Sequence, residues 1–198
     1  MRFSSNPHVV VVAGALEGIH ALMRLINALP YQFPAPIVAS VHGPCEHELQ
    51  RIARTQTGIS DRLTMVHAMD GDQLHLGRVY VAPASIDVAF TAKNLVRLMP
   101  SSSVPDQDGH PSTNADRLFK SAAQVYGAGA IGVVLSGRGK DGTSGLRAIT
   151  DAGGTRIVQS PSEANHPAMP THALMGDHVE FTVLLDEMGT LLNQLVAR

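Results

Sequence analysis

The feature that most constrains the fold is an alternation of short apolar runs with segments of helical periodicity. Residues 8–12 form a β-branched run, which predicts a fully buried strand. Apolar residues then recur at helical spacing from Ile19 to Leu29, and Pro30 ends that pattern. A second buried run follows at residues 37–41. A strand, a helix and a strand in this order predict a right-handed parallel βαβ unit.

The same alternation continues along the chain. It predicts strands at 78–82, 130–135, 156–159 and 179–183, and helices at 46–53, 116–125, 143–152, near Thr171 and from Leu184 onwards. Residues 86–98 predict a β-hairpin, and residues 101–114 a long polar loop. We therefore predict an α/β fold with a single doubly wound, mainly parallel sheet, helices on both faces, and the hairpin. One domain over residues 1–198 is expected, with its core at about 8–192.

Composition narrows the class of function. The 198 residues carry a net charge of -2, which provides no basic field for nucleic acid or anionic lipid. No apolar run reaches the ~20 residues of a membrane span. The single Cys45 precludes an intramolecular disulfide, and the first residues lack a signal-peptide pattern. We expect a cytoplasmic protein that neither binds nucleic acid nor inserts into a membrane.

Three loops follow predicted strands, where the ligand crevice of such a sheet lies. They span residues 14–18, 42–45 and 136–142. The first precedes a helix whose N-terminal N–H groups can face an anion or an oxyanion. Its glycines lack the spacing of a dinucleotide-binding loop, and a purely structural turn is the other interpretation.

His42 and Asp141 are candidate site residues in the other two loops. An imidazole at the end of a buried strand can be a general base, a ligand or a structural group. Cys45 and His47 lie near His42, but the spacing of recognised zinc sites is lacking, so we predict no metal. Asp141 is either an N-cap or first-turn carboxylate of the following helix, or a buried carboxylate that orients His42 as in a hydrolase triad.

Four motifs, in their order and spacing, resemble the catalytic domain of the bacterial chemotaxis protein-glutamate methylesterase, the CheB family. They lie at residues 69–72 with 77–83, at 116–123, at 136–142 and at Met169-Pro170. The resemblance implies the chemistry of that family, in which Ser, His and Asp hydrolyse glutamyl methyl esters on chemoreceptor helices and release methanol. It implies no cofactor, and it implies chemoreceptor signalling helices or other chemosensory proteins as partners.

The resemblance assigns His42 as the general base and Asp141 as its orienting carboxylate. The nucleophilic Ser of the family has no counterpart, because either Ala15 or Leu16 stands at its position, depending on the alignment. Arg138 replaces the usual Met beside the oxyanion, in a rim that also includes Leu16 and Gly139. Family members usually carry an N-terminal receiver domain; we expect none here, which leaves a separate receiver protein as a further partner.

Two functional hypotheses follow. The first is a CheB-type homologue that is catalytically impaired and acts by binding, because acyl transfer through a covalent ester needs a nucleophile. The second is an active methylesterase that uses a shifted nucleophile (Ser40, Ser136 or Cys45) or a water activated by His42. An unrelated doubly wound ligand-binding domain is a third alternative.

Overall fold

The computed structural model describes residues 7–15, 18–42, 63–82, 86–100, 114–176 and 179–197. Within them a seven-stranded sheet has the order β3-β4-β2-β1-β7-β8-β9, and every neighbouring pair is parallel. Its strands are β1 (Val9–Ala15), β2 (Ile37–His42), β3 (Thr64–His67), β4 (Arg78–Val81), β7 (Ala130–Val134), β8 (Thr155–Gln159) and β9 (Phe181–Val183). A separate antiparallel hairpin pairs β5 (Ile86–Ala92) with β6 (Leu95–Pro100). The predicted α/β fold with a mainly parallel sheet and a hairpin is confirmed.

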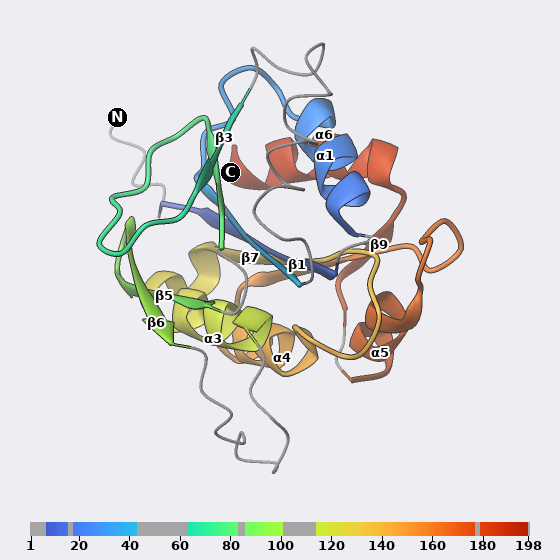
Figure 1. The fold of residues 1–198 in the computed structure, drawn as a ribbon. Helices are drawn as coiled ribbons and strands as arrows, with labels where there is room; N and C mark the ends of the chain where they lie inside the picture. The colour runs from blue at the N-terminus through green and yellow to red at the C-terminus, as the bar shows by residue number, and fades with distance from the viewer. Residues whose placement is uncertain are drawn as a thin grey trace.

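Helices cover both faces of the sheet, as predicted (Figure 1). On one face lie α1 (Gly18–Ala28) and α6 (Leu185–Val196); on the other lie α3 (Asn114–Tyr126), α4 (Thr143–Asp151) and α5 (Ala168–Gly176). A 3-10 turn, Gly127–Gly129, joins α3 to β7. Strand β1 lies in the middle of both cores, because Val10 and Val12 pack on the α1 side while Val9 and Val11 pack on the α3 side. A strand buried on both faces accounts for its unbroken apolar run.

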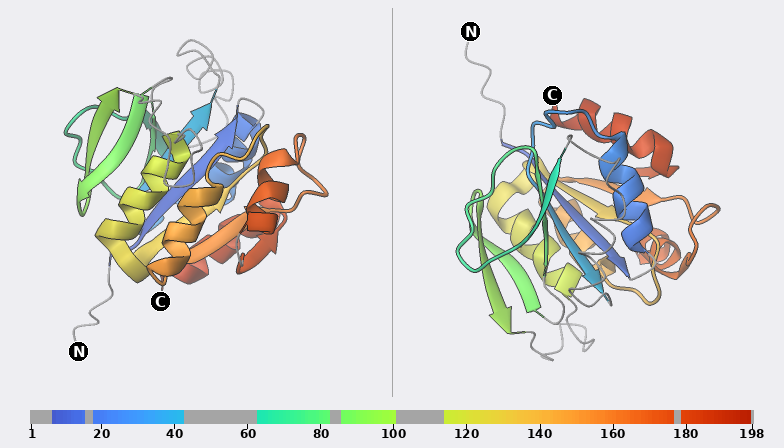
Figure 2. Two further views of the ribbon diagram at one scale, coloured as in Figure 1. Left: turned by 90° about the horizontal axis from the view of Figure 1, so that it is seen from below. Right: turned by 45° about the horizontal axis from the view of Figure 1, so that its top comes forward.

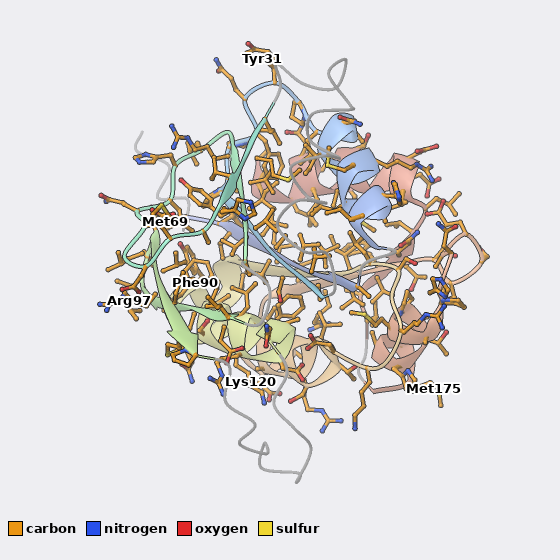
Figure 3. All side chains as sticks on the ribbon, in the orientation of Figure 1. Tyr31, Met69, Phe90, Arg97, Lys120 and Met175 are labelled. Atoms are coloured by element: carbon orange, nitrogen blue, oxygen red, sulfur yellow. The ribbon has the colours of Figure 1, made fainter. Side chains whose placement is uncertain are left out.

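The hairpin lies beside α3 (Figure 2). Phe90 of β5 is labelled in Figure 3. Its ring packs on α3, 5.3 Å from the ring of Tyr126 in an edge-to-face arrangement. Its N–H donates to Ser121 Oγ at 3.0 Å, which covers the outer edge of β5. The outer edge of β6 pairs with the segment after β3, where Gly71 N–H donates to Val96 O at 3.1 Å. Both outer edges therefore bond to neighbouring elements of the chain, which leaves fewer backbone groups for pairing with other strands.

The structure differs from the sequence-based elements in three places. Strand β3 is not predicted from the sequence, since its four residues lie at the sheet edge and include a polar residue at each end. Gly14 and Ala15 belong to β1 rather than to the loop, because pairing with β2 continues to the end of both strands. Asn114 begins α3 instead of ending the polar loop. The predicted helix 46–53 lies outside the described residues.

No helix within the described part of the chain is long and apolar enough to cross a membrane.

Candidate active site

The candidate site is the carboxyl end of β1. This strand lies between β2 and β7 in the sheet, so the chain turns outward in opposite directions on its two sides. Such a topological switch point is where open α/β sheets bind ligands. Ala15 ends β1, and its register partner on β2 is His42. The loop after β7 reaches the same edge, because Ala15 N–H donates to Ser136 O at 3.3 Å.

The loop after β7 is pressed closely onto Ala15. Ala15 is 8% exposed, and its side chain is a methyl group. A Cβ added to Gly137 would lie 2.9 Å from both Cβ and N of Ala15 and would collide with Met169 Sδ. A Cβ on Gly18, the first residue of α1, would collide with Ser136 O. Two glycines therefore permit the close approach of four segments at this point, namely β1, α1, the loop after β7 and α5.

Ser136 is anchored from the opposite side by the last residue of β8 and by the segment that follows this strand. Its N–H donates to Gln159 Oε1 at 2.8 Å, and its hydroxyl accepts the N–H of His166 at 3.0 Å. Gly137 N–H donates to His166 O at 2.9 Å, and Met169 N–H donates to Gly137 O at 2.9 Å. The Ser136 hydroxyl is thus already part of a buried structural network.

Asp141 is 6% exposed, and its carboxylate faces the first turn of α3. Oδ2 accepts the N–H of Ala115 at 3.3 Å, and Oδ1 accepts the N–H of Asp116 at 3.2 Å. The N-cap of α4 is Gly142, without a side-chain cap. Asp141 is therefore neither the N-cap residue nor a first-turn residue of the following helix, which corrects one of the two sequence interpretations. Asp141 caps a helix that begins 27 positions before it in the chain.

The rim of the candidate site is only partly described. Arg138 and Gly139 are exposed at the tip of the loop, and Gly139 has a φ of 90°, which glycine readily adopts. Leu16 and Cys45 lie outside the described residues, as does the side chain of His42. The contact between His42 and Asp141 and the roles assigned to the rim therefore stay predictions. Within the described ranges, no three His, Cys, Asp or Glu side chains gather as metal ligands would.

Sequence reasoning missed three contributors to this edge. Gln159 ends a buried strand, and a polar side chain at the end of such a strand could have indicated a residue that bonds at this edge of the sheet. Asp116 lies inside one of the four motifs, but nothing local shows that its carboxylate reaches α4. His166 contributes through its backbone, which gives no signal in the sequence.

A family model described as CheB methylesterase matches residues 10–192. The chain belongs to the CheB methylesterase family. This membership confirms the resemblance and rules out an unrelated ligand-binding domain.

Curated relatives and a solved structure agree with that membership. Protein-glutamate methylesterase/protein-glutamine glutaminase 1 of Myxococcus xanthus is 33% identical over 202 residues, which cover 100% of this chain and 57% of that protein. A putative protein of the same name from Leptospira interrogans is 29% identical and is matched over 95% of its own length. The crystal structure of the Thermotoga maritima CheB methylesterase catalytic domain has a TM-score of 0.82 at 27% identity, covering 96% of this chain and all of that one. The Myxococcus xanthus protein and four further relatives of the same name are longer than this chain. The matched region spans about half of their length, from 46% to 57%.

Proposed function

We propose that this CheB-family domain serves chemosensory signalling by binding rather than by hydrolysis. Its ligands are glutamyl side chains on chemoreceptor signalling helices. Its partners are those receptors or other chemosensory proteins, with a separate receiver protein among them. The domain is then a catalytically impaired homologue of the methylesterases that it resembles.

The observation that carries the proposal is Ala15. It ends β1 next to its register partner His42, at the switch point of the sheet, and offers only a methyl group there. Hydrolysis through an acyl intermediate needs a nucleophile. In a well-studied Ser hydrolase, loss of the Ser alone lowers turnover by about 10⁶-fold. We expect a loss on that scale here.

The competing proposal is an active methylesterase with a shifted nucleophile or a water activated by His42. The structure speaks against Ser136, whose hydroxyl is bonded to the backbone of His166 and which is only 1% exposed. Ser40 is also buried, at 3% exposure. Cys45 lies outside the described residues, so activity has to be measured directly.

The test is methanol release from a methylated chemoreceptor signalling fragment, compared between this protein and its Ala15→Ser variant. We expect no release above background from the protein as it is, and an increase of at least about 10³-fold in the variant. Ala128→Ser, which adds a hydroxyl at an exposed position in the turn before β7, should change nothing. Turnover by the unaltered protein that disappears in His42→Ala would overturn the proposal.

Binding is measured in parallel. If the rim of the site also differs from that of active enzymes, neither the unaltered protein nor Ala15→Ser will release methanol. Calorimetry with the same fragment should show saturable binding to the unaltered protein. A protein that releases no methanol and also fails to bind the fragment would contradict the proposal.

The names of the relatives supply a second readout. They are called protein-glutamine glutaminases as well as methylesterases. Amide hydrolysis at the same site would use the same nucleophile, so ammonia release from a glutamine-containing fragment should follow methanol release in every variant.

A further inference from the structure

Helix α5 has an uncharged outer face at the surface of the molecule. Among the described α-helices, it alone carries no Asp, Glu, Lys or Arg. Its inner face is buried through Met169, Pro170 and Ala173, and its outer face exposes Thr171, His172 and Met175. A surface helix ordinarily has charged residues on its solvent face, whereas a helix that is largely apolar all round is covered by another element. The outer face of α5 therefore has the composition of a contact surface.

Met175 is the most exposed of the large apolar side chains in the described part of the chain, at 81%. It lies at the periphery beside α5 (Figure 3). His172 precedes it by three residues, on the same face of the helix, and its Nδ1 lies 2.8 Å from Ala168 O. Methionine is flexible and polarisable, which suits it to surfaces that adapt to a partner.

Two cations flank the end of α5. Arg147, on α4, donates from Nη2 to Gly176 O at 3.0 Å. Lys140 lies before α4, and its carbonyl accepts the N–H of Thr143, against whose Cγ2 Gly176 packs. Both side chains are exposed, and neither forms an ion pair with an acid of the described residues. The exposed acid of α4, Asp151, lies at the other end of that helix.

The α5 patch, which comprises Lys140, Arg147, His172 and Met175, is continuous with the candidate site. The first turn of α5 contacts the loop after β7, because Met169 N–H donates to Gly137 O at 2.9 Å. The same glycine lies against Ala15. The nine residues of α5 span about 13 Å at 1.5 Å per residue. A partner helix that lies along α5 can therefore reach the edge of the candidate site with one end and the α5 patch with the other.

We propose that the α5 patch is a docking surface for an acidic amphipathic helix, namely the chemoreceptor signalling helix that presents the glutamyl side chain. The proposal rests on the proposed function only in this choice of partner. Apolar side chains of the helix cover Met175, and its carboxylates pair with Lys140 and Arg147. Complementary charge of this kind supports specificity and fast association. These carboxylates lie about seven to eleven residues from the glutamyl group, which is two to three turns along the partner helix.

The first experiment measures binding of the unmethylated signalling fragment to the full chain by calorimetry at low and high salt. Lys140→Met/Arg147→Met should weaken binding by about two- to thirty-fold at low salt, as expected for two exposed charge pairs, and by less at high salt. Lys93→Met/Lys120→Met removes the same charge at the hairpin turn and on α3, and should change the affinity by less than about 1.5-fold.

A conservative variant separates the charge of Arg147 from its bond to Gly176. Arg147→Lys keeps the cation and should bind within about two-fold of the unaltered protein. A loss in Arg147→Lys equal to that in Arg147→Met would assign the effect to the packing of α5 and would overturn the charge pairing.

The apolar part of the patch is tested by Met175→Ser. This variant should weaken binding by at least about three-fold at either salt concentration, because burial of apolar surface does not depend on charge screening. Met69→Ser is the matched control, since Met69 is 67% exposed near the hairpin, and it should leave the affinity unchanged. Equal effects of the two substitutions would overturn docking on α5.

A second fragment, whose methylatable glutamates are replaced by Ala, separates this inference from the proposed function. Its binding should still be weakened by the substitutions in the α5 patch. If both fragments bind equally and these substitutions weaken both, docking on α5 stands and the proposed recognition of the glutamyl group fails. If the glutamates contribute to binding and the α5-patch substitutions match their controls, the inference is overturned and the proposed function stands. The absence of binding by either fragment would contradict both.

Discussion

The backbone N–H of Ser136 donates to Gln159 Oε1 at 2.8 Å, and the two residues are 1% and 2% exposed. This bond joins the end of β8 to the residue whose carbonyl receives the N–H of Ala15. Water has no access to replace it. The position of the loop at the end of β1 therefore depends on a side chain two strands away in the sheet.

Replacing Gln159 with Met should destabilise the protein by about 1–3 kcal/mol. The substitution keeps the length of the side chain but leaves the Ser136 N–H buried without its acceptor. Chemical denaturation measures the free energy of unfolding. Gln124→Met is the matched control, because Gln124 is exposed on α3 and should change that energy by no more than about 0.5 kcal/mol. Equal effects of the two substitutions would contradict the role of this bond.

An ion pair between a half-buried arginine and a buried carboxylate joins the hairpin to α3. Arg117 Nη1 lies 2.6 Å from Asp87 Oδ2, and Asp87 is 1% exposed. Removing only the cation leaves a buried carboxylate without its counter-ion, so Arg117→Met should cost about 3–5 kcal/mol. The double variant Asp87→Leu/Arg117→Met should recover most of that loss in the same denaturation experiment. A double variant as unstable as Arg117→Met would show that the loss comes from packing rather than from the unpaired charge.

The sequence predicts an element well where the residues of that one strand or loop determine its structure. The apolar run of β1 predicts a strand buried on both faces, and the turn at Asn94, with a φ of 60°, lies inside the predicted hairpin. Strand β3 is different, since an edge position and pairing with β4 decide its structure rather than its own pattern.

Asp141 shows the same limit within the candidate site. Local capping rules connect it to α4, the helix that follows. Two of its partners are N–H groups of α3, which only the packing of α3 against α4 brings near. A carboxylate that caps a helix distant in sequence leaves no periodic signal, and the same holds for Asp116 toward Gly145.

An exposed ion pair should make the stability of the hairpin depend on pH. Arg97 Nε lies 2.7 Å from Asp70 Oδ1, and Figure 3 shows Arg97 at the outer side of the hairpin. The hydrogen bond from Arg97, and next that from Leu98 N–H, lower the pKa of Asp70 below its ordinary value. Because the folded-state pKa is the lower one, the stabilisation is present above the ordinary pKa and is lost as pH falls through the folded-state value.

NMR titration of the Asp70 carboxyl checks this expectation. Arg97→Met should raise its midpoint toward the ordinary value, and high salt should do so in part. A midpoint that does not move in Arg97→Met would show that the ion pair has no effect in solution.

Arg138 should favour glutamyl ligands that carry a free carboxylate. It is exposed on the loop that contacts Ala15, where the resemblance predicts the rim of the binding site. An exposed charge pair contributes about 0.2–1 kcal/mol, so Arg138→Met should weaken binding of a glutamate-containing receptor fragment by about 1.4- to 5-fold. The methyl ester of the same fragment has no charge at that position and should lose little affinity in this variant.

Calorimetry at low and high salt measures the affinity for both fragments, and added salt should reduce the difference between them. Lys120→Met, on α3, is the matched control for removal of a cation (Figure 3). Equal weakening for ester and carboxylate, or an equal effect in the Lys120 variant, would show that Arg138 does not select the charged ligand.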